Sequence, residues 1–274
     1  MTGLIEARYL DVAGSTAYVE IAGTGTPVLC VHTAGQSGVQ WRQTTARLAA
    51  LGHQVVVPDL PGHGRSDPAP GGPVQDLQVY SDWCAALIDA LGLDRPYVVG
   101  CSIGGKTVLD LAVRHGDRIS GVVAMAAEAS PGHVGLSGLR RELQDVAAPS
   151  RSDRTYLGTL AALGRSVPAE LAERIARMHR REDPEVSVSD LIGWGTHDVR
   201  DGLKDIVCPV QLVAGADDPW IDTGRVRATA AEIPDGRHTV LEGIGHYPME
   251  EMKDFAMILH GWLAELNTRD EVIA

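Results

Sequence analysis

The segment VVGCSIGGKT (residues 98–107) matches two patterns of chemistry-bearing residues at once. As G-x-S-x-G it predicts a sharp strand-to-helix turn that exposes the hydroxyl of Ser102 as a nucleophile. As G-x-x-x-x-G-K-[ST] it predicts a loop whose backbone amides and Lys106 would bind phosphate. Cys101, directly before Ser102, is a second potential nucleophile. Residues elsewhere in the chain must decide between these interpretations.

A serine nucleophile needs a histidine to take its proton and a carboxylate to orient that histidine. GADD (residues 215–218) and GIGH (residues 243–246) supply both, in the chain order serine, acid, histidine. The phosphate-binding interpretation would instead need Asp59, after the apolar VVVP, to hold a metal. The Gly- and Pro-rich segment that follows Asp59 fits the serine interpretation better. We therefore favour the serine nucleophile.

These residues lie where predicted strands end. Short β-branched segments alternate with segments of helical periodicity, which predicts a mostly parallel sheet with helices on both faces. Such a sheet binds its ligands beyond the carboxyl ends of its strands. The predicted strands are residues 15–22, 27–33, 54–60, 96–101, 119–127, 209–217 and 237–243, and the predicted helices are 41–51, 75–91, 103–115, 169–181, 222–233 and 250–266.

The alternation stops between Pro131 and Arg200, where helical segments occur without a strong strand. We predict that residues 131–200 form a helical cap (lid) inserted into an α/β core made of residues 1–130 and 201–274. A cap over the strand ends would exclude water from the site and select among substrates.

Five segments resemble the motifs of the α/β-hydrolase fold superfamily over nearly the full chain. They are VHTAG (31–35), PDLPGHGRSD (58–67), GCSIGG (100–105), GADD (215–218) and GIGH (243–246). The resemblance implies an α/β-hydrolase fold, with a mostly parallel eight-stranded sheet and a helical cap inserted after the sixth strand. The motifs are specific for the superfamily and weak for the substrate.

The resemblance implies a catalytic triad. Ser102 matches the nucleophile, His246 the general base and Asp218 the acid, because the acid usually lies three residues after the glycine of the motif. Asp217 is the alternative acid, and Glu128, at the end of the strand before the cap, is a more remote one. Each assignment rests on position in the motif.

The resemblance also implies an oxyanion hole made by the backbone amides of Ala34 and Ile103, aimed at the developing negative oxygen. The superfamily usually has glycine where this chain has Thr33. We predict that Thr33, Trp220 and Tyr247 contact substrate.

The remaining candidates have structural interpretations. Cys101 should turn away from the pocket as a buried thiol, and His32 and His63 should make structural hydrogen bonds. Trp41 and Trp194 are expected to pack. One arginine of the cap could bind a substrate carboxylate, the candidates being Arg140, Arg141 and Arg165.

We predict a cofactor-free serine hydrolase (an esterase or lactonase) that cleaves a small carboxylic ester or lactone through an acyl-enzyme. With a linker in place of the cap, we expect the sheet to fold and part of the hydrolysis of a small ester to survive. The closest alternative is carbon–carbon hydrolysis of a vinylogous diketone, but those enzymes usually have Asn before the serine and Trp after the histidine, where this chain has Cys101 and Tyr247. Thioester and amide hydrolysis stay open, whereas an epoxide hydrolase would want Asp at position 102.

Two further alternatives come from the same superfamily. Plant-type hydroxynitrile lyases share threonine at the position of Thr33, but they carry lysine beside the catalytic histidine. This chain has Tyr247 there and so lacks a cation for departing cyanide. The fold also serves as a hormone-binding receptor, often with a damaged triad, whereas every triad residue is present here.

Composition narrows the partners. The chain has 274 residues, 44% of them hydrophobic, and a net charge of −12. That charge argues against nucleic acid and anionic membranes as partners, so we expect a small-molecule substrate and leave homo-oligomerisation open. Four scattered cysteines and the absence of a signal-peptide pattern favour buried thiols in a cytoplasmic protein. No metal-ligand spacing occurs, so we predict no metal site.

Overall fold

The computed structural model describes residues 4–144 and 151–267. The strands are β1 Ile5–Val12, β2 Ser15–Ala22, β3 Thr26–Val31, β4 His53–Pro58, β5 Tyr97–Cys101, β6 Gly121–Met125, β7 Val210–Gly215 and β8 Gly236–Leu241. The helices are α1 Thr45–Ala49, α2 Leu77–Leu91, α3 Ile103–His115, α4 Leu136–Glu142, α5 Arg151–Ala162, α6 Ala169–His179, α7 Pro184–Thr196, α8 Thr223–Glu232, α9 Pro248–Glu251 and α10 Phe255–Asn267, with short 3₁₀ helices at Gly38–Trp41 (η1), Gly116–Arg118 (η2) and Arg200–Asp205 (η3).

The strands form one eight-stranded sheet in the order β1-β2-β4-β3-β5-β6-β7-β8. β2 pairs antiparallel with β1 and β4, and every later neighbour pair is parallel, which confirms the predicted mostly parallel sheet. The pattern did not reveal β1, because most of its side chains are exposed. Ala13 and Gly14, at φ 51° and 82°, join β1 to β2 through a two-residue turn of the hand that suits a hairpin.

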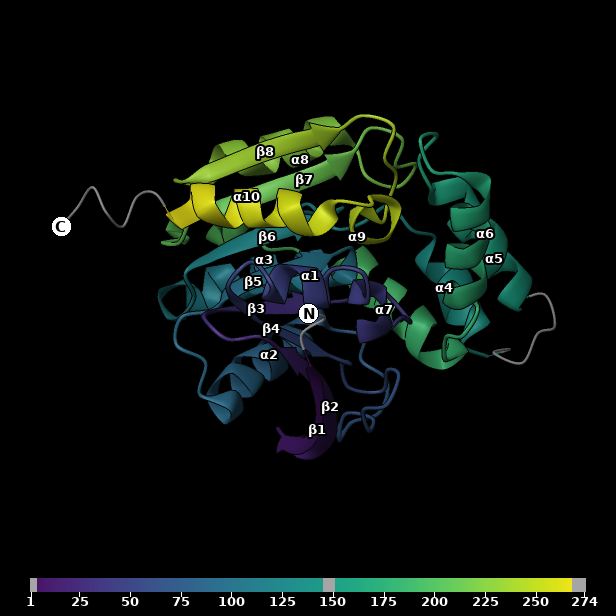
Figure 1. The fold of residues 1–274 in the computed structure, drawn as a ribbon. Helices are drawn as coiled ribbons and strands as arrows, with labels where there is room; N and C mark the ends of the chain where they lie inside the picture. The colour runs from purple at the N-terminus through teal and green to yellow at the C-terminus, as the bar shows by residue number, and fades with distance from the viewer. Residues whose placement is uncertain (1–3, 145–150, 268–274) are drawn as a thin grey trace.

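The hydrophobic core fills the two interfaces between the sheet and the helices that cover its two faces. Strands β5, β6 and β7 are buried along their whole lengths, as expected for parallel strands covered on both faces. Helices α1 and α10 contact each other on one face, while α2 packs against α3 on the other (Figure 1). Both α3 and α8 also contact η3.

Two predicted helices are interrupted. The expected helix over residues 41–51 is η1 followed by the shorter α1. The expected helix over residues 250–266 is divided into α9 and α10 because Met252 adopts an extended conformation, at φ −98° and ψ 121°. This break lets α9 begin directly after His246 and Tyr247.

We call residues 131–200 the cap segment. It contributes α4 to α7 between β6 and β7, without a strand in its described residues, and α4 to α6 gather beyond the carboxyl ends of the strands (Figure 1). Helix α7 starts at Pro184 with the Asp183 carboxylate accepting from two backbone amides, a standard N-cap. It packs against α2 and α3 as well as α4, so it links the cap segment to the sheet. The division into separate domains stays a prediction.

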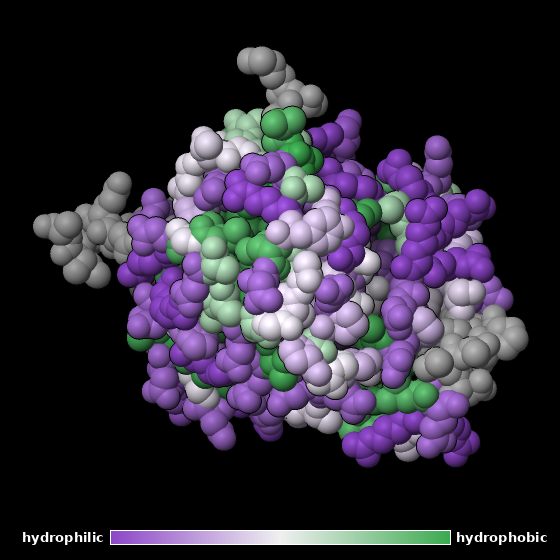
Figure 2. Space-filling view, turned by 90° about the horizontal axis from the view of Figure 1, so that it is seen from below, coloured by the Kyte–Doolittle hydropathy of each residue, from purple (hydrophilic) through white to green (hydrophobic). Residues whose placement is uncertain are grey.

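The surface offers few cues to function. Figure 2 shows a face on which hydrophilic side chains surround small apolar patches, which are ordinary for a folded protein. No helix in the described parts of the chain is long and apolar enough to cross a membrane.

Candidate active site

Ser102 occupies the strained turn that the sequence predicts. It lies between β5 and α3 at φ 58° and ψ −118°, in the region that L-residues rarely adopt. The turn requires glycine on both sides. A Cβ on Gly100 would lie 2.1 Å from the carbonyl oxygen of Gly104, and one on Gly104 would lie 2.5 Å from that of His32.

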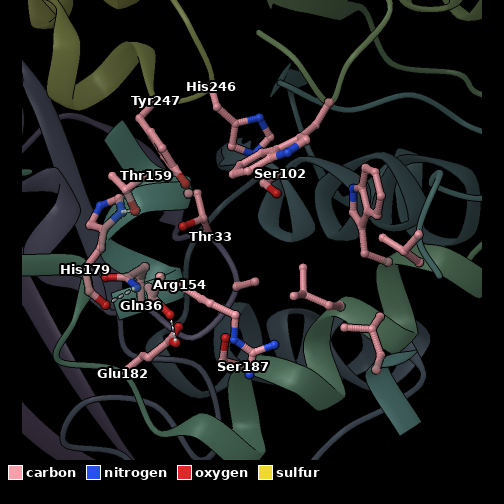
Figure 3. Close-up of a pocket in the computed structure, with 18 of the residues that line it drawn as sticks. Thr33, Gln36, Ser102, Arg154, Thr159, His179, Glu182, Ser187, His246 and Tyr247 are labelled. Carbon is pink, nitrogen blue, oxygen red and sulfur yellow. Dashed lines mark hydrogen bonds between the residues drawn. The ribbon is translucent and has the colours of Figure 1, made fainter. Parts of the chain in front are cut away.

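His246 contacts the second of the two neighbouring carboxylates. Its Nδ1 lies 2.7 Å from Oδ2 of Asp218. The other oxygen of Asp218 accepts from the backbone amides of Trp220 at 2.9 Å and Ile221 at 3.3 Å, which fixes the carboxylate in place. A carboxylate at Nδ1 keeps a proton on that nitrogen and leaves Nε2 as the acceptor. The ring of His246 lies beside Ser102 at the edge of a pocket (Figure 3).

The two alternative acids are engaged elsewhere. Asp217 pairs with Arg165 of the cap segment, whose NH1 lies 3.1 Å from its Oδ1. Glu128 lies 2.9 Å from Nε of Arg225. Neither carboxylate has a hydrogen bond to His246 among the described residues.

A buried carboxylate that the sequence did not reveal holds the loop of His246. Glu251 accepts from the backbone amides of Gly245 at 2.7 Å, Tyr247 at 2.8 Å and Gly164 of the cap segment at 3.0 Å. Burial raises the pKa of Glu251, and the three amide bonds oppose that effect. In the sequence, Glu251 looked like one charged position on a helix.

Cys101 is a buried thiol, as predicted. Its Sγ donates to the carbonyl oxygen of His246 at 3.2 Å, away from the pocket. Burial, reinforced by nearby carboxylates including Asp218, raises its pKa well above the ordinary value, so it stays protonated. All four cysteines are free and buried, which confirms the predicted thiols.

In the loop after β3, the amides on both sides of Ala34 are held by hydrogen bonds. The amide of Thr33 donates to Oε1 of Gln40 at 2.9 Å, that of Gly35 to Oδ2 of Asp190 at 2.8 Å, and that of Gln36 to the carbonyl of Thr33 at 3.2 Å. The amide of Ala34 has no partner among the described residues. Ile103 opens α3, so its amide lacks a helical partner as well.

The two histidines of the predicted loops make structural hydrogen bonds, as expected. His32 bridges the carbonyl of Thr33 and the amide of Leu60, both at 2.9 Å, and burial lowers its pKa to about 4. His63 lies between the carbonyl of Pro61 and the carboxylate of Asp190.

The pocket beside Ser102 has a volume of about 370 Å³ (Figure 3). All three predicted contact residues line it. The ring of Trp220 lies 4.7 Å from that of His246, centroid to centroid, and the ring of Tyr247 lies 4.9 Å from it. Thr33 reaches the pocket while its hydroxyl lies 3.1 Å from Oε1 of Gln40. Their contact with a substrate stays a prediction.

Comparison with known proteins shows the family of this chain. The model of the alpha/beta hydrolase fold family matches residues 26–252. The chain belongs to the alpha/beta hydrolase fold family.

Its relatives in this hydrolase family differ in activity. The chain is 26% identical over 254 residues to 2-hydroxy-6-oxo-6-phenylhexa-2,4-dienoate hydrolase of Burkholderia cepacia, covering 85% of both chains. It is 29% identical over 249 residues to a pimeloyl-[acyl-carrier protein] methyl ester esterase of Aromatoleum aromaticum, covering 85% of this chain and 96% of that one. A thermophilic esterase from Thermogutta terrifontis superposes with a TM-score of 0.83 at 25% identity, covering 94% of this chain and 99% of the other.

Most residues of the pocket wall in this hydrolase belong to the cap segment, and none of these cap residues lies in one of the five sequence motifs. Arg154 lines the pocket and donates to Glu142, whereas Arg140, Arg141 and Arg165 do not line it. Trp194, expected only to pack, lines it as well. The other cap residues of the wall are His133, Val134, Leu139, Glu142, Thr155, Gly158, Thr159, His179, Glu182, Ser187 and Leu191.

Lys106, the residue that suggested a phosphate-binding loop, points elsewhere. It is fully buried, and its Nζ donates to the carbonyl oxygens of Ser130 at 2.5 Å, Glu128 at 3.2 Å and His197 at 3.5 Å. Burial lowers its pKa to about 8, although the carboxylate of Glu128 opposes this. Lys106 therefore joins the entry and the exit of the cap segment. In the described residues, no group of three His, Cys, Asp or Glu could hold a metal.

Proposed function

We propose that this hydrolase cleaves a small carboxylic ester or lactone, with Ser102, His246 and Asp218 as its catalytic triad. Ser102 Oγ attacks the carbonyl carbon while its proton moves to Nε2 of His246. The tetrahedral oxyanion would accept from the amides of Ala34 and Ile103. His246 then protonates the leaving alkoxide, and the ester bond breaks to leave an acyl-enzyme. Water, deprotonated by His246, releases the acid and restores Ser102.

One observation carries this proposal. Asp218 holds His246 through Nδ1 at 2.7 Å, on the wall of the pocket into which the turn at Ser102 projects. This is the arrangement in which the histidine can accept the serine proton and the carboxylate stabilises the resulting imidazolium.

The proposal is tested with a fluorophosphonate probe and a panel of esters and lactones. We expect one label, on the peptide that contains Ser102, and hydrolysis that disappears in Ser102→Ala. A label on Cys101, or full activity in Ser102→Ala, would refute the assignment. Binding without turnover of any member of the panel would favour a receptor.

Carbon–carbon hydrolysis is the second candidate, supported by the likeness to the dienoate hydrolase. The substrate of that relative, by its name, carries a carboxylate. The arginine of the described pocket wall, Arg154, donates to Glu142, and Glu182 adds a second acid to the same wall. This lining favours an uncharged substrate. Adding a vinylogous diketone acid to the panel compares the two candidates directly.

The residue after the histidine does not favour a cyanohydrin lyase. Tyr247 is buried, and burial raises its pKa well above the ordinary value, so its hydroxyl is neutral at physiological pH. Tyr247 therefore supplies no positive charge that could receive cyanide.

A further inference from the structure

Asp190 is a buried carboxylate that the proposed mechanism does not use. It lies in α7 of the cap segment, and its side chain has no exposed surface. Oδ1 accepts from the hydroxyl of Tyr80 at 2.7 Å. Oδ2 faces Nε2 of His63 and accepts from the amide of Gly35, both at 2.8 Å. Its three partners all belong to the core.

His63 is the titratable partner of Asp190 in this cluster. Nδ1 of His63 lies 3.0 Å from the carbonyl oxygen of Pro61, to which it donates, while Nε2 faces the carboxylate. Burial alone would lower the pKa of His63, but Asp190 outweighs it and the net pKa is raised. A buried carboxylate is costly unless its oxygens are hydrogen-bonded, and both oxygens of Asp190 have such contacts.

The Asp190 bond fixes one side of the proposed oxyanion donor. Gln40 holds the amide of Thr33, and Asp190 holds that of Gly35, so both neighbours of Ala34 are tied. Of the amides of residues 33–36 in the described structure, that of Ala34 is the one left for a ligand. Gly35 has a φ of 65°. Because glycine can adopt many backbone conformations, an untethered loop would hold this one only part of the time.

We propose that Asp190 is a positioning residue for the oxyanion hole: by binding the amide of Gly35 it aims the amide of Ala34 at the reacting carbonyl. This rests on the proposed serine hydrolysis. It makes the cap segment part of the catalytic geometry, in addition to its place in the pocket wall. Asp190 acts through the loop and touches no substrate.

Asp190→Leu tests this, because leucine has the shape of aspartate but accepts no hydrogen bond. With p-nitrophenyl acetate we expect kcat to fall about tenfold to a hundredfold, less than the loss of a whole oxyanion donor, while KM stays within about threefold. The inhibition constant of trifluoroacetone should rise by a similar factor. Ser102 adds to this ketone, its proton passes to His246, and the carbonyl oxygen becomes the oxyanion.

Two further variants complete the test. Asp190→Asn, a weaker acceptor, should change kcat and the inhibition constant about threefold to tenfold. Tyr80→Phe removes the bond to the other oxygen and should leave both constants within about twofold, whatever stability it loses.

The outcomes separate the two proposals. An active wild type with unchanged kcat and inhibition constant in the Asp190 variants overturns the positioning role, and so does a change in KM alone. If Asp190→Leu does not fold, Asp190→Asn decides. If the wild type hydrolyses the ester and Ser102→Ala keeps that activity, the proposed function is refuted instead.

Discussion

Asp217 and Asp218 are adjacent, yet their carboxylates serve different contacts. Asp218 faces His246, while Asp217 faces the exposed Arg165. In Asp218→Asn we expect kcat to fall about 10³–10⁴-fold with the fold intact, because His246 loses its tautomer and its counter-charge. Asp217→Asn loses only a solvent-screened ion pair and should keep kcat within about threefold. Steady-state kinetics and circular dichroism of both variants check this, and reversed effects would make Asp217 the acid.

The four thiols give a second prediction at the residue scale. Burial raises the pKa of each, to about 12 for Cys84 and Cys208. Since the thiolate is the reactive form, iodoacetamide at neutral pH should leave the folded protein unlabelled and its rate of p-nitrophenyl acetate hydrolysis unchanged. The denatured chain should be labelled at all four cysteines. Mass spectrometry measures both, and native labelling of Cys101 with loss of activity would contradict the prediction.

At the scale of elements, Lys106 of α3 holds both ends of the cap segment. The titration of its amine should therefore make the free energy of unfolding depend on pH. Its pKa is about 8 in the fold, against 10.5 for an ordinary lysine, and it faces Glu128, Asp198 and Arg225. Below about pH 8 folded and unfolded chains both carry the proton, and the cost of burying the charge is present in full. Between pH 8 and 10.5 only the unfolded chain keeps it, so the free energy of unfolding rises with pH, by about 1.4 kcal/mol per unit at most.

Lys106→Met isolates this contribution. The difference in free energy of unfolding, wild type minus Lys106→Met, should increase from about pH 8 to about pH 10 in urea titrations. The exposed Lys204 offers a matched control, since Lys204→Met should give no such trend. A difference that stays flat with pH would contradict the burial of a charged amine at this site.

The sequence predicted the elements that follow simple periodic rules. The buried strands from β2 to β7 have a strong sequence pattern, because burial leaves few residue types to choose from. The turn at Ser102 has one as well, because its positive φ and close backbone contacts require glycine on both sides. The cap residues of the pocket wall follow no such sequence pattern. A side chain such as Arg154 or Thr159 lines the pocket because of how α5 packs in the folded protein. Glu251 and Asp190 were missed for a related reason, as they accept from backbone amides of other segments, which no residue pattern records.

At the scale of the whole molecule, buried polar contacts connect the cap segment to the core. His179 lies 2.6 Å from Glu250, Asp190 faces His63, and Gly164 donates to Glu251. Replacing residues 131–200 with a Gly/Ser linker would remove one buried partner from each of these core groups. Contrary to the expectation from sequence, we expect the truncated protein to lose hydrolysis of p-nitrophenyl acetate by at least about a hundredfold, and to melt at a lower temperature. Survival of most of this activity in a folded protein would contradict it.

The position of the cap segment in the chain also bears on synthesis. Ser102 and the loop after β3 precede it, whereas Asp218 and His246 follow it, in the segments after β7 and β8. A ribosome that has completed the cap segment therefore carries a chain with the proposed nucleophile but without the proposed base. Because domains fold from the amino end during translation, the strained turn at Ser102 can form while its hydroxyl is still unreactive. On the proposed mechanism, acyl transfer begins only when the segment after β8 brings His246 to Ser102, so the nascent chain stays inert until its last strand has been made.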